Sequence, residues 1–330
     1  MVKIAVIGCG MVAEEMHLPA FTSIPGASVT ALVDVDPKAL NRMGDRYGIK
    51  ARYADYRRML RKEPVDAVSV CTPNYLHAQM TVDCCRAGKY VLVEKPAATS
   101  LAEIQRMKAA ADKAGVFVMV EQYHRFVATN ERARSVVQSG ILGKVTGFHA
   151  CLRAGGPARW APDSKWFWKK SQAFGGALAD LGIHIIDTVR WITGKEIRSV
   201  QCVTSKIGRR GDVEDNAVLT ATTADGLVGT VDVSWTQVPG RLAIEVYCEN
   251  GLLETVGYKF LRATMTEPRA EVTFDVPKES PTGGPFKYFV ECVRTGRRPF
   301  VDIVEGGRSL AVVIAAYDSA ASGGTARVRY

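Results

Sequence analysis

The chain has 330 residues, which exceeds the size of most single hydrophobic cores and predicts two domains. Its 43 lysine and arginine residues outnumber its 34 aspartate and glutamate residues, and the formal net charge is +9. The basic residues are scattered, and their densest clusters are short and lie beside helix-like segments. This pattern favours a solvated surface over a nucleic-acid groove, so we expect no nucleic-acid partner.

No targeting or membrane segment is expected. The N-terminal apolar run stops at a glycine turn and meets Glu14 and Glu15 without a cleavage site, and no apolar stretch approaches the roughly 18 residues that a membrane span requires. The eight cysteines show no C-x-x-C pairing, and most lie inside apolar patterns where cysteine behaves as a small hydrophobe. These features predict a cytoplasmic protein with no membrane partner.

The first residues of the chain predict a nucleotide-binding turn. An apolar strand over residues 2–7 leads into Gly8-Cys9-Gly10 and then into a helix start, Met11-Val12-Ala13. Gly8 permits the tight turn, Gly10 lets the backbone approach a pyrophosphate, and Ala13 is small enough to replace the usual third glycine. The phosphates would meet the free N–H groups at the helix N-terminus.

A second apolar strand, over residues 29–33, ends at Asp34. An acid at this distance from the glycine turn can accept hydrogen bonds from the adenosine ribose 2′-hydroxyl, which favours NAD over NADP as the cofactor. The alternative is that Asp34 or Asp36 caps the helix that begins at Pro37.

Residues 1–122 alternate between strand-like and helix-like segments, which predicts an α/β domain with a doubly wound parallel sheet. Ligands of such sheets bind outside the carboxyl ends of the strands. Thr72 and Asn74 follow the strand over residues 66–70, and Glu94-Lys95-Pro96 follows the strand over residues 90–93. We therefore expect Thr72 and Asn74 to face the cofactor, with Lys95 at the same edge.

Residues 123–330 have a different pattern, which predicts an α+β domain with a large, mostly antiparallel sheet. Two closing helices are expected to cover one face of this sheet. The uncovered face would expose apolar surface unless another copy packs on it, so we expect a homodimer or homotetramer. Strands are expected near 144–153, 199–206, 217–223, 228–235, 242–248, 252–258, 261–266 and 271–275, and helices near 129–139, 176–193, 285–296 and 305–321.

Two groups of residues could carry chemistry. Lys95 stands between an apolar strand and a proline, so its backbone is held in place. After Gly175-Gly176, a helix presents Asp180, His184 and Asp187 at positions i, i+4 and i+7, which share one face. On these residues alone a structural role stays open, with His184 in a domain interface and Asp180 as a first-turn acid that the helix dipole favours.

Four aromatic residues lie between positions 160 and 168, one of them Trp166. Such rings suit the apolar faces of a pyranose or cyclitol, and packing between domains explains them equally well.

Several of these elements, in this order, resemble the Gfo/Idh/MocA oxidoreductases, the family of glucose–fructose oxidoreductase and inositol dehydrogenase. The resemblance covers essentially the whole chain. It implies a Rossmann domain that binds NAD and an open-faced sheet domain used for oligomerisation. The matching elements are Gly8-Cys9-Gly10, Thr72-Pro73-Asn74 with His77, the segment from Gly88 to Pro96, and Gly175-Gly176 followed by Asp180 and His184.

The resemblance also implies roles for single residues. By motif, Lys95, Asp180 and His184 form the catalytic group, and Glu94 lies near the nicotinamide ribose. Asn74 and His77 fall in the cofactor-binding part of the pattern. Tyr123, His124 and Arg125 stand where many members carry an Asn/Arg-rich stretch, and we expect them, together with Trp166, to contact the substrate.

The chemistry of alcohol oxidation fits these roles. A neutral imidazole at His184 can accept the hydroxyl proton near pH 7. The ammonium of Lys95 can stabilise the developing alkoxide, and Asp180 can hold the substrate hydroxyl in register.

We therefore expect an NAD-dependent oxidoreductase that acts on a secondary alcohol of a sugar, sugar derivative or cyclitol, without a metal ion. One alternative is an enzyme that retains and recycles its NAD, as in aldose–aldose oxidoreduction or oxidation-assisted glycoside cleavage. Others are a non-catalytic NAD-sensing protein and a metal site at Asp180 and His184.

Overall fold

The structure is a computed structural model that describes residues 1–208 and 210–330. These residues form two compact units. The first comprises Met1–Glu121 and Pro285–Gly307, and the second comprises Gln122–Gly284 and Arg308–Tyr330. The first unit's main segment therefore ends within a residue of the boundary expected at 122, but the segment 285–307 belongs to the first unit and not to the second.

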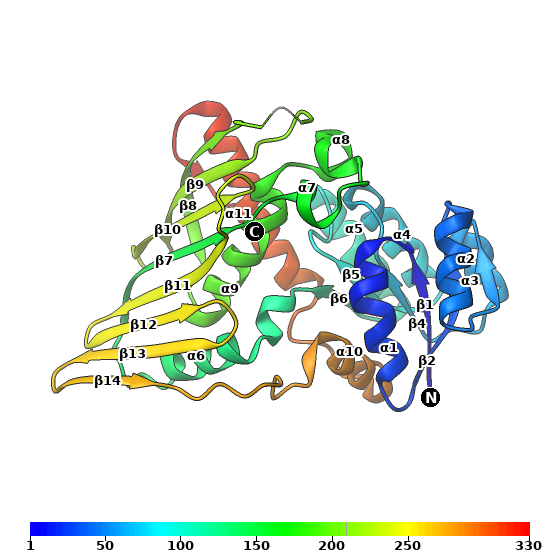
Figure 1. Cartoon of the computed structure of the whole chain (residues 1–330), viewed down its shortest axis with the longest axis horizontal. Coiled ribbons are helices and arrows are strands. Elements are labelled where there is room, and N and C mark those ends of the chain that lie inside the picture. The colour runs from blue at the N-terminus through cyan, green and yellow to red at the C-terminus, as the bar shows by residue number, and fades with distance from the viewer. Residues whose placement is uncertain (209) are drawn as a thin grey trace. The chain divides into compact units, whose positions relative to one another are not determined.

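The first unit contains a parallel sheet with strand order β3-β2-β1-β4-β5-β6, of which Figure 1 labels every strand except β3. This is the strand order of the Rossmann fold, so the expected doubly wound parallel sheet is confirmed. Its central strands are mostly apolar because helices cover both faces of such a sheet. The strands are β1 (Val2–Ile7), β2 (Ala27–Val33), β3 (Ala51–Tyr53), β4 (Ala67–Val70), β5 (Tyr90–Glu94) and β6 (Val118–Glu121).

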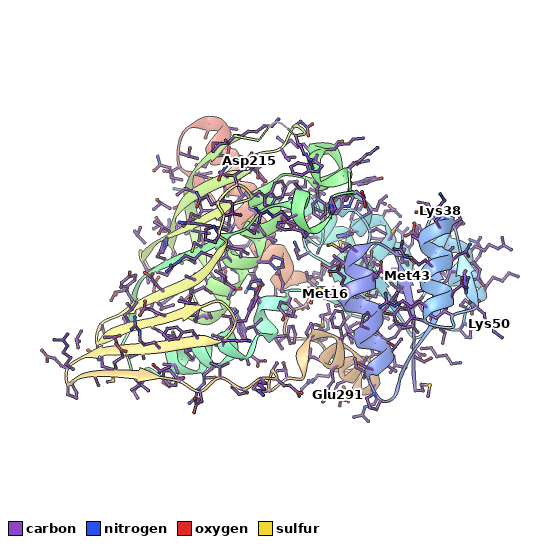
Figure 2. All side chains as sticks on the ribbon, in the orientation of Figure 1. Met16, Lys38, Met43, Lys50, Asp215 and Glu291 are labelled. Carbon is purple, nitrogen blue, oxygen red and sulfur yellow. The ribbon has the colours of Figure 1, made fainter. Side chains whose placement is uncertain are left out.

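Local sequence signals set the helices of this unit. Asp36 caps α2 by accepting a hydrogen bond from the Lys38 backbone N–H, and Ser100 caps α5 in the same way through the Glu103 N–H. Figure 2 labels two residues of α2, Met43 and Lys38. The side chain of Met43 is buried, and Lys38 is exposed. The helices are the π-helical turn η1 (Ala13–His17), α1 (Leu18–Ser23), α2 (Pro37–Arg46), α3 (Tyr56–Lys62), α4 (Asn74–Arg86) and α5 (Leu101–Ala114).

Helix α10 (Gly284–Thr295) packs within the first unit through its aromatic residues. The rings of Phe286 and Phe289 make edge contacts with Phe21 at centroid distances of 5.3 and 6.3 Å, and Phe289 also contacts Phe117 at 6.1 Å. The expectation that α10 covers the second sheet is therefore wrong. The apolar face of this helix was visible in the sequence, but nothing in it specified which sheet the face covers.

The second unit is built on a sheet with strand order β14-β13-β12-β11-β7-β10-β9-β8-β15. Strands β7 and β10 are parallel, and the other neighbouring strands among the described residues are antiparallel, which confirms the mostly antiparallel sheet. The strands are β7 (Val145–Arg153), β8 (Ile197–Ser205), β9 (Asn216–Thr223), β10 (Val228–Ser234), β11 (Arg241–Cys248), β12 (Gly251–Val256), β13 (Phe260–Thr266), β14 (Arg269–Thr273) and β15 (Ala326–Arg327).

The two faces of this sheet differ in burial. On one face Phe148, Leu219 and Val231 are buried, and helices α6 and α9 lie against that side (Figure 1). On the other face Val203 and Val218 are 71% and 57% exposed. One face of the sheet is therefore open in the single chain, as expected from the sequence.

The helical segments of the second unit are short except for three helices. They are η2 (Tyr123–Phe126), α6 (Ala128–Gln138), α7 (Pro157–Trp160), η3 (Trp166–Trp168), α8 (Lys170–Ala173), the π-helical turn η4 (Leu178–Gly182), α9 (Ile183–Thr193) and α11 (Ile303–Ser322), which starts in the first unit. Among the described residues, we find no helix whose length and apolar character would let it cross a membrane.

Candidate functional site

The glycine turn after β1 is shaped by close backbone contact. Gly8 has a φ of +97°, and a Cβ added to it would lie 2.5 Å from the carbonyl oxygen of Cys71. A side chain at this position would collide with backbone. A Cβ at Gly10 would meet nothing within 4 Å, so the turn leaves open space there. This geometry fits a turn whose backbone receives a ligand, because Gly10 lies directly before the helix start.

The carboxylate of Asp34 is fixed against this turn. Its Oδ2 accepts a hydrogen bond of 2.6 Å from the Cys9 backbone N–H, and its Oδ1 accepts one of 2.8 Å from the Asp36 N–H. The cap of α2 is Asp36, whose Oδ1 accepts a hydrogen bond from the Lys38 N–H. Of the two alternatives left by the sequence, the capping role therefore belongs to Asp36, and Asp34 stands beside the glycine turn.

His77 joins the two segments that follow β4 and β5. Its Nδ1 lies 2.9 Å from the carbonyl oxygen of Pro96 and its Nε2 lies 2.6 Å from that of Thr72. The ring is fully buried, and burial lowers the pKa of His77 although both backbone contacts act to raise it. This geometry favours a positioning role, in which His77 holds the segments containing Thr72 and Lys95, over the direct cofactor contact expected from the sequence.

Glu94 is held by His17, a histidine that no sequence motif indicated. His17 Nε2 lies 2.8 Å from Glu94 Oε1, and its Nδ1 lies 2.7 Å from Ser69 Oγ. Burial acts to raise the pKa of Glu94, but the hydrogen bond from His17 and the charges of His17 and Lys95 bring the pKa below its usual value. The carboxylate is therefore ionised and fixed at the end of β5, directly before Lys95, whose N–H donates to Glu94 Oε2 at 3.2 Å.

In the second unit, the helix that carries Asp180 and His184 begins at a partly buried carboxylate, that of Glu214. The backbone N–H groups of Gly176 and Leu178 each donate to Glu214 Oε1 at 3.0 Å, and the Ala177 N–H donates to the Glu214 carbonyl at 3.0 Å. These N–H groups lie at the start of the helix, where backbone N–H groups have no hydrogen-bond acceptor within the helix. A negative charge at this end also interacts favourably with the helix dipole.

The paired glycines make this contact possible. A Cβ on Gly176 would lie 1.7 Å from the Glu214 carbonyl oxygen, and one on Gly175 would lie 1.8 Å from the hydroxyl oxygen of Tyr317. The Tyr317 hydroxyl donates to Glu214 Oε1 at 2.8 Å and accepts from the Ala179 N–H at 3.2 Å. The close approach that the glycines predicted is therefore an approach to Glu214 and Tyr317, neither of which the sequence indicated.

Asp180 lies in the π-helical turn η4, and an indole orients it. The Trp235 Nε1–H donates to Asp180 Oδ2 at 3.1 Å. The Trp235 ring is itself packed against Trp168, with centroids 5.6 Å apart at 71°. Within the aromatic loop, Trp168 therefore supports the orientation of Asp180 through Trp235, while Trp166 stacks on Phe167 at a centroid distance of 3.8 Å.

His184 lies at the start of α9 beside His124. Their ring centroids are 4.8 Å apart and the planes are tilted by 34°. The ring of Tyr258 lies 5.7 Å from that of His124 and 6.2 Å from that of Tyr123. The structure therefore brings Tyr123 and His124 to the same part of the second unit as His184.

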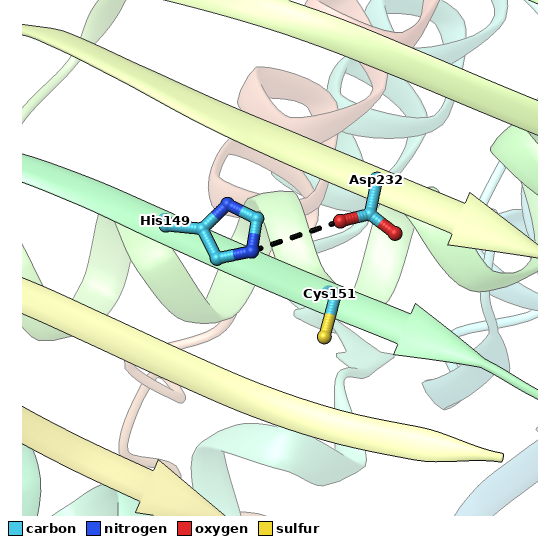
Figure 3. A group of neighbouring side chains, drawn as sticks. All are labelled: His149, Cys151 and Asp232. Atoms are coloured by element: carbon cyan, nitrogen blue, oxygen red, sulfur yellow. Dashed lines mark ion pairs between the residues drawn. The ribbon is translucent and has the colours of Figure 1, made fainter.

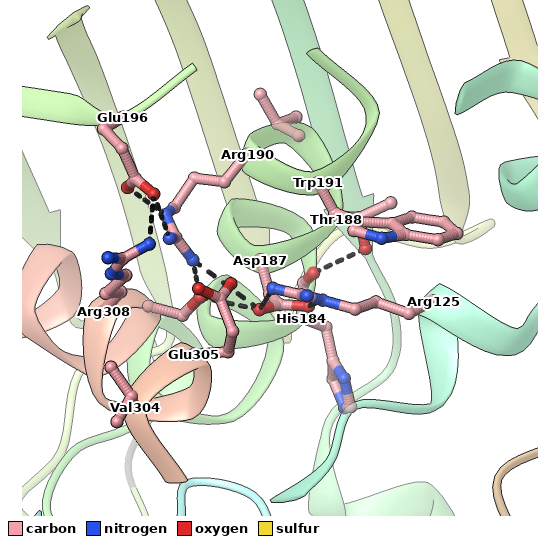
Figure 4. Close-up of polar contacts among 12 residues, drawn as sticks. Arg125, His184, Asp187, Thr188, Arg190, Trp191, Glu196, Val304, Glu305 and Arg308 are labelled. Atoms are coloured by element: carbon pink, nitrogen blue, oxygen red, sulfur yellow. Dashed lines mark hydrogen bonds and ion pairs between the residues drawn. The ribbon is translucent and has the colours of Figure 1, made fainter. Parts of the chain in front are cut away.

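Arg125 and Asp187 form a buried ion pair (Figure 4). The guanidinium of Arg125 donates two hydrogen bonds of 2.7 and 2.8 Å to Asp187, whose carboxylate also accepts from Ser309 Oγ at 2.7 Å. The Arg190 guanidinium donates to Ser309 Oγ and to Glu196. Both groups of the Arg125–Asp187 pair are almost completely shielded from water, so this arrangement favours a structural role for Arg125 that fixes η2 to α9.

One group of metal-binding residue types comes together among the residues that the structure describes, and it does not include Asp180 or His184. It consists of His149, Cys151 and Asp232 on the second sheet.

The geometry of the first unit is suited to binding a dinucleotide. The turn at Gly8 and Gly10 leaves room for a pyrophosphate before a helix start, and a fixed carboxylate stands beside it at Asp34. Thr72 and Lys95 lie just beyond the carboxyl ends of β4 and β5 in the same sheet.

Comparison with known proteins agrees with this geometry. Residues 2–122 match the oxidoreductase family with an NAD-binding Rossmann fold, and residues 130–254 match the GFO/IDH/MocA C-terminal domain. The chain belongs to the Gfo/Idh/MocA family. Its first unit is accordingly an NAD-binding Rossmann domain of an oxidoreductase.

Individual members of the family are similar over most of the chain. Myo-inositol 2-dehydrogenase of Thermotoga maritima is 27% identical over 96% of this chain and 96% of that protein. D-glucoside 3-dehydrogenase of Escherichia coli is 30% identical over 70% of this chain and 66% of that protein. The crystal structure of GenD2 from gentamicin A biosynthesis, in complex with NAD, is 28% identical, with a TM-score of 0.87 over 100% of this chain and 97% of that one.

Asp34→Ala should narrow the preference for NAD over NADP. In the wild type, the carboxylate would repel a 2′-phosphate, and like-charge contacts of this kind cost several kcal/mol. We expect kcat/KM to favour NAD by at least about tenfold in the wild type, since about 1.4 kcal/mol is worth that factor. The variant should lose this preference mainly through weaker NAD binding.

Asp36→Ala is the matched control for Asp34→Ala. It removes the cap of α2, at a cost of about 1 kcal/mol of stability, but should leave the ratio of kcat/KM with NAD to kcat/KM with NADP unchanged. A wild type that uses NADP as well as NAD would contradict the assignment of Asp34.

Glu214→Gln should change the pH dependence of stability. Burial raises the pKa of Glu214, although hydrogen bonds from Tyr317 and the helix start oppose this. A carboxyl whose pKa is higher in the folded state stabilises the fold below its unfolded pKa, about 4.3. That contribution is lost as the pH rises through the folded pKa. The wild type should therefore lose stability relative to the variant as the pH rises above about 4.3.

Denaturant unfolding of both proteins between pH 4 and pH 8 measures this difference. Glu279→Gln, a change at an exposed position of the same unit, should leave the pH dependence as it is in the wild type. If the curves of the wild type and Glu214→Gln ran parallel, the raised pKa would be wrong.

Proposed function

We propose that this chain catalyses the NAD-dependent oxidation of a secondary alcohol of a sugar, sugar derivative or cyclitol. The observation that carries this proposal is the fixed start of one helix, which presents Asp180, oriented by Trp235, and His184, whose ring lies beside that of His124. The similarity to an inositol dehydrogenase and a glucoside dehydrogenase supports the substrate class.

The chain's own residues supply the proton chemistry and the charge. The imidazole of His184 accepts the proton of the reacting hydroxyl, since a neutral ring is a suitable base near pH 7. The ammonium of Lys95 stabilises the negative charge that develops on the alcohol oxygen. Asp180 accepts a hydrogen bond from a substrate hydroxyl and fixes its position, because Trp235 already holds the carboxylate.

NAD, when bound, accepts the hydride from the carbinol carbon. Gly8, Gly10, Met11 and Val12 would hold its pyrophosphate, and Asp34 would hold its adenosine ribose. Glu94, kept ionised by His17, would bind the nicotinamide ribose hydroxyls. Thr72 and Asn74 would line the same edge of the sheet, with Asn74 at the start of α4.

A panel of sugars and inositols, each supplied with NAD and with NADP, tests the proposal through the absorbance of the reduced cofactor. We expect turnover with at least one polyol and with NAD as the preferred cofactor. No turnover with any polyol, together with intact NAD binding, would favour a protein that senses NAD without catalysis.

His184→Ala should reduce kcat by about 10²–10⁴, the contribution of a general base, which corresponds to roughly 3–5 kcal/mol of barrier. Lys95→Met, which keeps the bulk but not the charge, should cost a comparable factor. Both variants should bind NAD as the wild type does, measured by calorimetry. The fold-loss of kcat in the double variant should be far smaller than the product of the two single fold-losses, because the two groups act on one oxygen.

Lys113→Met provides a matched control for the charge change, because Lys113 is exposed on α5 of the same unit as Lys95. It should keep full turnover. If His184→Ala and Lys95→Met both kept near wild-type turnover, the catalytic assignment would be wrong even though the family is right.

We also propose that the enzyme is a homodimer or homotetramer that assembles through the open sheet face, and that it works in the cytoplasm. Exposed Val203, Val218 and Val228 on neighbouring strands of this face support the first point. Eight free cysteines, seven of them buried, support a reducing compartment.

Val218→Asp should convert the assembly to monomers, because it places a charge among the exposed apolar side chains through which the copies would pack. Light scattering at micromolar concentration measures the mass, and circular dichroism checks the fold. Ile141→Asp, at a position that is 63% exposed outside the sheet, should leave the mass unchanged. A wild type that is strictly monomeric would refute assembly through this face.

A further inference from the structure

Three side chains of metal-binding type stand together on the open face of the second sheet (Figure 3). His149 and Cys151 are alternate residues of β7, so their side chains share a face. Asp232 lies directly opposite Cys151 in the register of the parallel strand β10. The backbone of two paired strands therefore fixes the positions from which all three side chains project.

Their potential ligand atoms are close enough to share an ion. His149 Nε2 lies 3.8 Å from Asp232 Oδ2, and the ligand atoms of all three residues lie within 4.8 Å of one another. A tetrahedral zinc ion, with bonds of about 2.0–2.3 Å, places its ligand atoms roughly 3.3–3.7 Å apart. Small side-chain rotations would bring the three atoms to that spacing without any change in strand register.

Neighbouring groups already orient two of these ligands. Thr230 Oγ1 lies 2.8 Å from His149 Nδ1, which leaves Nε2 directed toward Asp232. The Arg153 Nε–H donates to Asp232 Oδ1 at 2.5 Å, so Oδ2 is the oxygen on the side of His149. Metal-binding histidines and carboxylates are characteristically fixed by hydrogen bonds of this kind to their other atoms.

The ligand types select among metals. A thiolate, an imidazole and a carboxylate form a set that suits Zn²⁺, whereas Mg²⁺ and Ca²⁺ prefer oxygen ligands throughout. The thiolate and the carboxylate balance the two charges of the ion, and Arg153 adds one positive charge nearby. In the single chain the side chain of His149 is 37% exposed, so an ion can reach the site before chains assemble through this face, while Cys151 is only 1% exposed.

We propose that His149, Cys151 and Asp232 bind one zinc ion per chain on the open face of the sheet. Three protein ligands leave a fourth position for water. This site is separate from the oxidoreductase chemistry, since its residues lie on β7 and β10 and none of them is Lys95, Asp180 or His184.

Cobalt(II) titration of the full-length, untagged protein, reduced and first treated with EDTA, tests the site. Bound cobalt should give a thiolate charge-transfer band in the near ultraviolet and intense visible bands of a tetrahedral ion, saturating at one ion per chain. Added zinc should abolish both. Cys151→Ser should remove the thiolate band, and Thr230→Val should weaken binding about 10- to 100-fold, as is typical when a metal ligand loses its supporting hydrogen bond.

Cys248→Ser is the matched control, because Cys248 is a buried cysteine of the adjacent strand β11. It should keep the cobalt spectrum, and circular dichroism should show that all variants fold. An absent thiolate band, or a band that persists in Cys151→Ser, would overturn the proposal. Neither readout uses NAD or an alcohol, so the result is independent of the proposed enzyme activity.

Discussion

The chemistry assigned to this chain depends on how one helix begins. Glu214 accepts hydrogen bonds from two first-turn N–H groups, and its backbone comes so close to Gly176 that no side chain fits between them. The carboxylate neutralises the positive end of the helix and fixes its direction. Asp180 and His184 project from the turns that follow, so their positions are set by a residue from a distant part of the chain and not by helix geometry alone.

The same principle operates in the nucleotide-binding unit. Gly8 lets the turn after β1 contact the backbone at Cys71, and a π-helical turn lies early in the following helix, as it does in the helix that carries Asp180. Such wider turns often occur at functional sites. His17, which lies in the first of them, reaches Glu94 and keeps its carboxylate ionised next to Lys95. In each unit a glycine contact places the backbone, and a polar contact orients a neighbouring carboxylate: His17 orients Glu94, and Trp235 orients Asp180.

Most of the fold could be predicted from the sequence, because strand alternation, glycine turns and helix caps such as Asp36 and Ser100 depend on residues close together in the chain. The sequence also contained the motif residues Lys95, Asp180 and His184. It could not identify Glu214, Tyr317, Trp235 or His17, because each acts through a contact with a residue far away in the chain and has no local pattern of its own. The position of α10 was missed for the same reason, since an apolar helix face does not specify its partner.

The proposed reaction depends on His184 as the base that accepts the alcohol proton. The pH profile of kcat/KM, measured with a polyol substrate in the wild type and in His184→Ala, tests it most directly. We expect kcat/KM of the wild type to fall on the acid side as the imidazole becomes protonated, and we expect this acid limb to be absent from the residual activity of the variant. The same acid limb in both proteins would contradict it.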